Sequence, residues 1–221
     1  MLRLSDLQFS YPGQRFVLRL ARFEVSPGES VALTGPSGCG KSTLLRLCAG
    51  ILQPDSGQIK LGDFAMTGCP ELARRDFRLR QIGLVFQEFE LLPYLDVAQN
   101  ILAPLRLIPG VRVDAAAHRR LDEMTARTGL KPVLDHLPAE LSGGEKQRTG
   151  ICRALIHQPR FILADEPTSN LDAESQERAL DLLLSQSRQA GASLLVVSHA
   201  REALGRFDRV ENLPDLLTAA S

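Results

Sequence analysis

One nine-residue stretch constrains this chain more than any other. Residues 35–43 read GPSGCGKST, which matches the spacing G-x-x-x-x-G-K-[ST] of a nucleotide phosphate-binding loop. The apolar run 30–33 before it predicts a strand, and the leucine-rich stretch 43–50 after it predicts a helix. The motif therefore stands in the strand, loop and helix context that it requires.

The residue types of this loop suit a polyphosphate. Glycines let backbone N–H groups come close to phosphate oxygens, and the following helix directs the positive end of its dipole at the same anion. Lys41 is expected to contact the β and γ phosphates, and Ser42 to bind Mg²⁺. The nucleotide ligands expected in the loop are Gly35, Ser37, Gly38, Cys39, Gly40, Lys41, Ser42 and Thr43. A glycine turn before an ordinary helix is the simpler alternative.

Length and composition narrow the class of protein. A chain of 221 residues can form one substantial α/β domain with a large apolar core. Its 26 basic and 26 acidic residues balance, so no basic field favours nucleic acid, and no such partner is expected. The four cysteines form no regular framework and no signal peptide is recognised, which favours a reducing cytosol. No apolar run approaches the roughly 20 residues of a membrane-spanning helix.

The order of elements predicts an α/β fold within a single domain, 1–221. Residues 2–24 alternate like an antiparallel β ribbon, and strands are expected at 58–61, 82–86, 161–164 and 193–198. Helices are expected at 97–107, 115–127, 143–157 and 173–189. Strands alternating with helices favour a parallel sheet covered on both sides. We expect 88–157 to form an inserted helical subdomain, and 1–87 with 158–221 to form the β ribbon and core.

Two acids follow the apolar run 161–164, at the carboxyl end of the expected strand. Parallel sheets place ligand sites at this edge. Asp165 is expected to hold Mg²⁺, and Glu166 to orient or deprotonate an attacking water. A solvated strand end before a proline turn is the alternative.

Residues 141–148, LSGGEKQR, are the most specific string after the phosphate loop. Ser142 and Glu145 have the spacing of a capping box, which would simply start a helix. Gly143 and Gly144 would each weaken that helix by roughly 1 kcal/mol. They are explained if the phosphate of another molecule must approach the helix start.

In their order, these motifs resemble those of the nucleotide-binding subunits of ABC transporters, over nearly the whole chain. The phosphate loop resembles the Walker A motif, and residues 161–166 resemble Walker B. Residues 141–147 resemble the LSGGQ-type signature, 169–172 the D-loop, Gln87 the Q-loop, and His199 the switch histidine. Tyr11 stands where the family carries an aromatic that stacks on adenine. Asn170, Gly150 and a C-terminal end without the usual hairpin glycine depart from the pattern.

The resemblance implies a P-loop NTPase (RecA-like) core with an antiparallel β subdomain and an inserted helical subdomain. It implies an ATPase that uses ATP and Mg²⁺ and forms a head-to-tail homodimer around two ATP molecules. Ser142, Gly143, Gly144 and Asp172 would face the nucleotide of the partner. His199 would contact the γ-phosphate, and Gln87 would link Mg²⁺ and water to the helical lobe. The dimer would drive a membrane permease from the cytoplasmic, inner face of the membrane.

The stretch 80–93 and Asn100 are similar to the subgroup that serves lipoprotein release and macrolide-type export. A small-solute importer or a cell-division regulatory ATPase acting on a membrane partner are the alternatives. The short separation of Gln87 and Leu141 leaves no room for the coiled coils of chromosome ATPases. Phe89, Leu91 and Leu92 are expected to form either lobe core or a docking groove for a permease helix.

Overall fold

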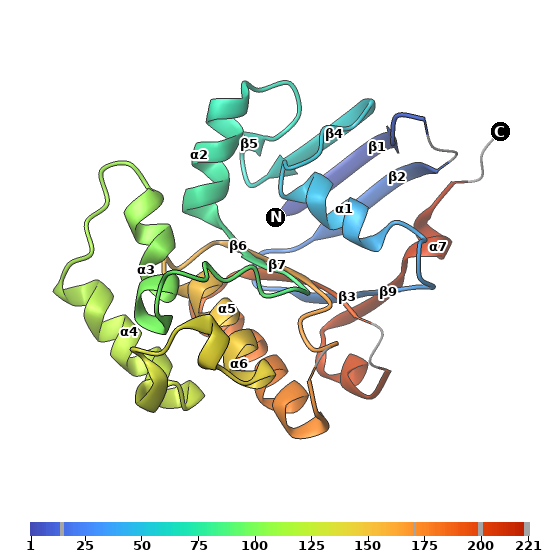
Figure 1. Cartoon of the computed structure of the whole chain (residues 1–221). Coiled ribbons are helices and arrows are strands. Elements are labelled where there is room, and N and C mark those ends of the chain that lie inside the picture. The colour runs from blue at the N-terminus through green and yellow to red at the C-terminus, as the bar shows by residue number, and fades with distance from the viewer. Residues whose placement is uncertain (14–15, 170, 199–200, 219–221) are drawn as a thin grey trace.

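Two sheets lie against each other in the computed structural model, which describes residues 1–13, 16–169, 171–198 and 201–218 (Figure 1). The central sheet is parallel throughout. Its strands, in spatial order, are β6 (Ile82–Val85), β7 (Phe161–Asp165), β8 (Ser193–Val197), β3 (Ser30–Thr34) and β9 (Arg209–Asn212). The parallel sheet expected from the sequence is confirmed.

The second sheet is antiparallel and contains the expected β ribbon. Its spatial order is β2 (Val17–Val25), β1 (Leu2–Ser10), β4 (Ser56–Leu61) and β5 (Phe64–Ala65). The register of β1 shifts against β4 between Ser5 and Gln8, where Asp6 has a φ of 50°. This bulge lets Leu4 and Leu7, which differ in sequence parity, both point into the core.

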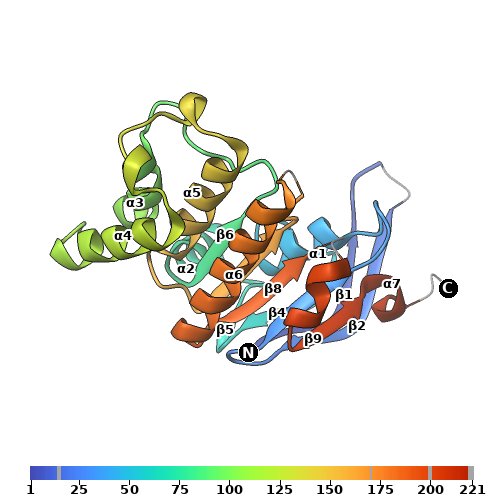
Figure 2. The same ribbon diagram turned by 90° about the horizontal axis from the view of Figure 1, so that it is seen from below.

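Helices cover both sides of the central sheet. They are α1 (Lys41–Cys48), α2 (Glu71–Gln81), α3 (Val97–Leu107), α4 (Ala115–Thr128), α5 (Gly143–Leu155), α6 (Ala173–Ala190) and α7 (Leu213–Leu216). Short 3-10 turns occur at Lys131–Val133, Pro138–Glu140 and Arg201–Arg206. Viewed from below, α3, α4 and α5 gather at one end, while α7 lies beside β2 at the other (Figure 2).

The central strands separate two apolar cores. Along β7, Ile162 and Ala164 pack with α3 to α6, whereas Phe161 and Leu163 pack with α1 and the antiparallel sheet. Both faces of β7 and β8 are buried, which explains the unbroken apolar runs of these two strands in the sequence. Burying one such Leu or Ile side chain contributes about 1.5–3 kcal/mol.

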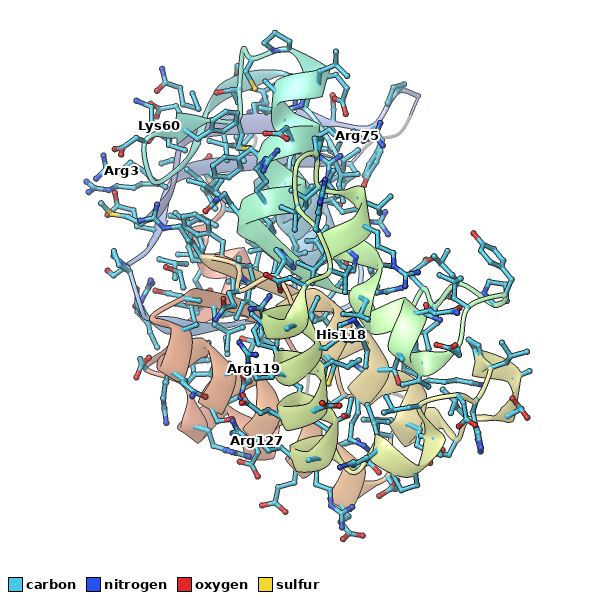
Figure 3. All side chains as sticks on the ribbon, turned by 90° about the vertical axis from the view of Figure 1, so that its left-hand side faces the viewer. Arg3, Lys60, Arg75, His118, Arg119 and Arg127 are labelled. Atoms are coloured by element: carbon cyan, nitrogen blue, oxygen red, sulfur yellow. The ribbon has the colours of Figure 1, made fainter. Side chains whose placement is uncertain are left out.

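Helix α2 is a feature that the sequence analysis missed. None of its side chains is fully buried, so it lacks the apolar stripe by which a helix is recognised. Instead, Arg78 donates to the carbonyl oxygens of Ala49 and Gly50, and the ring of Phe77 stacks on Phe64 at 4.2 Å. Exposed basic side chains, including Arg75 on α2 and Arg119 on α4, project from this side of the molecule (Figure 3).

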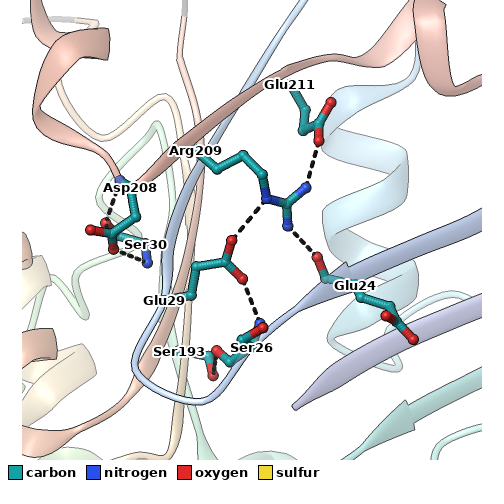
Figure 4. Close-up of polar contacts among 8 residues, drawn as sticks. All are labelled: Glu24, Ser26, Glu29, Ser30, Ser193, Asp208, Arg209 and Glu211. Atoms are coloured by element: carbon teal, nitrogen blue, oxygen red, sulfur yellow. Dashed lines mark hydrogen bonds and ion pairs between the residues drawn. The ribbon is translucent and has the colours of Figure 1, made fainter.

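The C-terminal edge of the sheet is held by charge rather than by a hairpin. Arg209 on β9 donates to the Glu29 carboxylate at 2.8 Å, the Glu211 carboxylate at 2.5 Å and the Glu24 carbonyl oxygen at 2.5 Å (Figure 4). Next to it, Asp208 accepts hydrogen bonds from the N–H and hydroxyl of Ser30. These bonds fix β9 to the start of β3 without the glycine whose absence the sequence analysis noted.

Candidate nucleotide site

The phosphate loop joins β3 to α1 through three glycines in backbone conformations that other residues avoid. Gly35, Gly38 and Gly40 have φ values of 141°, 79° and 105°. A Cβ atom on Gly40 would also lie 2.7 Å from the Cζ atom of Phe16. Glycine is thus favoured at these positions by backbone geometry, because it alone adopts such positive φ values without strain.

The loop curls around the Lys41 ammonium group. Lys41 is 6% exposed, and its Nζ donates to the carbonyl oxygens of Gly35 at 2.9 Å and Pro36 at 3.0 Å. The cation is therefore held in place by the loop itself. It stands at the start of α1, where helix N–H groups and the helix dipole also favour an anion.

Ser42 and Asp165 bring two oxygens together beside this cation. The Ser42 hydroxyl donates to Asp165 Oδ1 at 2.9 Å. Asp165 ends β7 and is 8% exposed. Burial raises the pKa of the Asp165 carboxyl, while the Ser42 hydrogen bond and the charges of Arg46 and Lys41 oppose that rise. A hydroxyl and a carboxylate side by side are the hard oxygen donors that Mg²⁺ prefers.

A cavity of about 310 Å³ lies against the loop and is lined by Tyr11, Phe16, Gly38, Gly40, Lys41, Ser42 and Thr43. The phenol oxygen of Tyr11 is 3.2 Å from the Thr43 hydroxyl, and the Tyr11 ring meets Phe9 edge-on at 4.8 Å. Both contacts fix the ring beside the loop. Six of the residues predicted from the sequence, namely Tyr11, Gly38, Gly40, Lys41, Ser42 and Thr43, therefore line one cavity.

Phe16 is a cavity residue that the sequence analysis missed. Its ring lies 6.1 Å from that of Tyr11 and its Cζ reaches the backbone of Gly40. Phe16 stands just before β2. An aromatic at that place was visible in the sequence, but the fold alone shows that it lies against the phosphate loop.

Glu166 follows β7 in a conformation unusual for its residue type. Its φ is 45°, and its backbone N–H donates to the Val197 carbonyl oxygen at 3.0 Å. The Glu166 carbonyl oxygen accepts from the backbone N–H and hydroxyl of Ser169. A non-glycine residue held in the left-handed region costs of order 1–3 kcal/mol and is typical of functional sites.

Gln87 lies two residues beyond β6, and its side chain is exposed. Since β6 is parallel to β7, the carboxyl ends of both strands meet at one edge of the sheet, so Gln87 and Asp165 leave the sheet at the same edge. His199 was expected to join them after β8, but it lies outside the described residues.

The signature residues lie apart from this cavity. Helix α5 belongs to the core on the opposite side of the central sheet from α1 (Figure 1). Ser142 and Gly143 are exposed at its start, and neither they nor Gly144 line the cavity. A Cβ atom on Gly144 would lie 3.0 Å from the Ser175 hydroxyl at the start of α6.

Helix α5 begins with the capping box that the sequence predicts. Ser142 Oγ accepts from the Glu145 N–H, and Glu145 Oε2 accepts from the Ser142 N–H at 2.8 Å and from its hydroxyl at 2.6 Å. Asp172, another expected nucleotide ligand, caps α6 by accepting from the Ser175 N–H at 3.0 Å. That bond lowers the pKa of the Asp172 carboxyl.

Comparison with known proteins identifies the family. Residues 18–169 match the family described as ABC transporter. A lipoprotein-releasing system ATP-binding protein LolD of Legionella pneumophila is 42% identical, over 88% of this chain and 85% of that protein. LolD 1 of Rhodospirillum rubrum is 41% identical, over 96% and 94% of the two chains. An uncharacterized ABC transporter ATP-binding protein of Mycobacterium tuberculosis is 42% identical, over 96% and 86%.

A solved structure gives the same result. The ATP-binding cassette MJ0796, in a dimeric post-hydrolysis state with ADP and Pi, superposes with a TM-score of 0.88 at 29% identity and covers 96% of this chain and 94% of its own. The chain belongs to the ABC transporter family, with the P-loop NTPase fold and antiparallel sheet that the sequence predicts. It is an ATP-binding subunit with ATPase activity. ATPase subunits of this family dimerise and work with membrane permeases.

Among the described residues, no helix has both the length and the apolar character needed to cross a bilayer. That part of the chain also holds no group of three or more His, Cys, Asp or Glu residues placed to bind a metal ion.

Proposed function

We propose that this chain is the ATPase of a lipoprotein-release or export-type transporter. The observation that carries the proposal is the identity of 41–42% to lipoprotein-releasing ATP-binding proteins over most of both chains. A small-solute importer and a cell-division regulator remain the alternatives, and the experiment below separates them. We place the chain at the cytoplasmic face of the membrane, held there by a permease.

In the proposed site, Ser42 and Asp165 hold Mg²⁺, with Gln87 as a further ligand, and the ion offsets phosphate charge. The 2.9 Å contact between Ser42 and Asp165 supports this assignment, because the two oxygens are already within reach of one ion. Lys41 and the N–H groups of residues 35–43 bind the β and γ phosphates. Tyr11 stacks on the adenine, with Phe16 on the same side of the cavity.

Glu166 accepts the proton of the attacking water, and we propose His199 as the contact to the γ-phosphate. The position of Glu166 directly after Asp165 supports its role, because a residue there lies beside the bound phosphates. Gln87 carries the state of the site to residues 88–157, which we propose act as a helical unit of the single domain. The rest of the chain, 1–87 and 158–221, holds the nucleotide.

Ser142, Gly143, Gly144 and Asp172 are proposed to face the ATP held by a second copy of the chain. Their separation from the cavity and the exposure of Ser142 and Gly143 support this. Each of the two sites in the dimer would then combine a phosphate loop with the signature of the partner.

The proposal is tested by reconstitution with the membrane proteins encoded beside this gene. We expect the chain to co-purify with one of them and to drive ATP-dependent release of a lipid-modified protein from vesicles. The matched control replaces the wild-type chain with the Glu166→Gln chain at the same concentration, and this control should release no lipid-modified protein. Uptake of a small solute in place of release would favour the importer, and ATPase activity without any transport would favour the regulator.

A further inference from the structure

The chain leaves β6 through a loop with two strained residues. Phe89 and Glu90 have φ values of 56° and 50°, and neither is glycine. Backbone in the left-handed region is strained for any residue other than glycine, and for a bulky Phe the conformation is a marked outlier. The two strained residues follow Gln87 closely, at the point where the core gives way to the helical segment. Contacts from another part of the chain are needed to hold this strained backbone.

Arg153 of α5 holds both strained residues. Its Nη2 donates to the Phe89 carbonyl oxygen at 2.7 Å, and its Nη1 donates to the Glu90 carbonyl oxygen at 2.5 Å. One planar guanidinium thus binds two consecutive carbonyls, for which its rigid fork is suited and an ammonium group is not. Hydrogen bonds from a charged donor are stronger than those from a neutral donor, so this pair of bonds opposes the strain of the loop.

Gly150, one turn before Arg153, faces the same loop. Residues three apart lie on the same face of a helix. A Cβ atom on Gly150 would be 3.6 Å from the Phe89 carbonyl oxygen, which is an ordinary van der Waals contact, so the loop packs closely against this turn of α5. The sequence analysis noted Gly150 as a departure from the family pattern. In the structure α5 continues through it, and the glycine faces the loop.

Placing the charged guanidinium of Arg153 in a partly buried position costs free energy of desolvation, which its hydrogen bonds to the loop must offset. Burial lowers the pKa of the guanidinium, an effect that the charge of Glu90 partly opposes. A solvated arginine would avoid that cost, because its long side chain could extend to water. The bonds to the loop therefore offset a real desolvation penalty.

We propose that Arg153 is a positioning residue that ties the loop after Gln87 to helix α5. The helix runs unbroken from Gly143 to Leu155, so Arg153 and Ser142 are on one rigid element, roughly 16 Å apart at 1.5 Å per residue. A movement of Gln87 toward the nucleotide then displaces the start of α5 as well. This inference rests on the role proposed above for Gln87.

The test is a double-mutant cycle on ATP hydrolysis. Arg153→Met removes the donors but keeps the length of the side chain, and we expect kcat to fall by about tenfold while ATP affinity changes less than about twofold. Gln87→Ala should lower kcat at least as much. Because both changes break one linkage, the double variant should be no slower than Gln87→Ala alone. Arg153→Lys keeps the charge and serves as a second variant in case Arg153→Met fails to fold. Its kcat should remain below that of the wild type.

The outcomes separate the two proposals. If Gln87→Ala hydrolyses ATP at the wild-type rate, both the role of Gln87 and the linkage through Arg153 are wrong. If Gln87→Ala is slow but the two losses multiply in the double variant, Arg153 acts independently and only the linkage is wrong. An Arg153→Lys chain that folds and matches the wild type in kcat would also overturn the linkage, since it would show that the fork is not needed.

Discussion

Two helix starts in this molecule were expected to face phosphate, and they are built differently. Helix α1 has Gly40 as its N-cap, with no side chain capping the helix and no acid in its first turn. Helix α5 has Ser142 as its N-cap, and Glu145 accepts hydrogen bonds from both the N–H and the hydroxyl of Ser142. At the start of α1, no side chain of the described residues caps the backbone N–H groups that lie next to Lys41. At the start of α5, Ser142 caps the helix and the Glu145 carboxylate lies beside it.

The two helix starts therefore differ in their capacity to bind nucleotide within one chain. The bonds from Ser142 lower the pKa of Glu145, so its carboxylate is ionised at neutral pH. An anion at a helix start stabilises the helix by about 0.3–1 kcal/mol and disfavours a second anion there. We infer that α1 binds ATP alone, and that α5 engages only an ATP already held by another chain.

The largest effect is expected for Glu166→Gln, which leaves both helix starts intact. Loss of the carboxylate should slow hydrolysis by about 10²–10⁴-fold while ATP still binds and holds two chains together. Single-turnover assays and sedimentation with ATP measure the two effects. Glu177→Gln, at an exposed position on α6, is the control. Hydrolysis near the wild-type rate would remove Glu166 from the mechanism, and a monomer with ATP bound would contradict the shared site.

Lys41→Ala removes the cation at the start of α1 and leaves the start of α5 unchanged. The variant loses the charge at the phosphates and the bonds that shape the loop, so ATP affinity should fall by at least about 100-fold. Calorimetry measures this directly. Lys60→Ala, on the exposed side of β4, should bind ATP normally. Unchanged affinity in Lys41→Ala would contradict the assignment of the loop.

Labelling of Cys39 measures how accessible the start of α1 is to a thiol reagent. Cys39 is half-buried in the loop at a helix start, where a thiol is reactive, so a thiol reagent should modify it and inactivate the chain, and MgATP should protect it. Burial raises the pKa of both Cys48 and Cys152 to about 12, so these thiols should stay unmodified and serve as internal controls. Mass spectrometry locates the label. Equal labelling of Cys39 with and without nucleotide would show that the thiol is shielded from the site.

The smallest effect concerns the charge at α5. Glu145→Gln, made in the Glu166→Gln chain, should tighten the ATP-dependent dimer about twofold to fivefold, since an anion near the partner's phosphates is removed. The folded pKa of Glu145 is lowered, so its contribution to stability is present above its ordinary pKa and is lost as pH falls through the lowered value. The melting temperature of the variant should accordingly fall slightly at pH 7 and match the parent in acid. A weaker dimer would contradict this account.

The α1 site could be predicted because its determinants are local. The spacing of Gly35, Gly40 and Lys41 fixes a loop whose backbone and charge need no distant partner. The acids at the end of β7 were also found, because a buried parallel strand reads as an apolar run. The roles of these residues are predictions that the Glu166→Gln and Lys41→Ala variants test.

Distant contacts explain what the sequence did not reveal. Helix α2 is held by arginine bonds to Ala49 and Gly50 and by a ring stack, and β9 by Arg209 and Asp208 bonds to residues about 180 positions away. Phe16 enters the cavity only because the β ribbon turns toward α1. Leu91 and Leu92 are both half-buried, and Leu91 packs against the helical core, so the docking groove and the lobe core both stay predictions for this segment.

We infer that each ATP site combines the α1 start of one chain with the α5 start of another. Mixing two inactive variants of the chain tests this inference. Lys41→Ala lacks a working phosphate loop, and Gly143→Asp places a charge on the exposed start of α5. Each alone should hydrolyse almost no ATP, although Gly143→Asp should bind it normally. Mixed in equal amounts, they should recover roughly a quarter of wild-type hydrolysis, since about half of random dimers are mixed and each of these has one intact site. A mixture no more active than its separate components would contradict the claim.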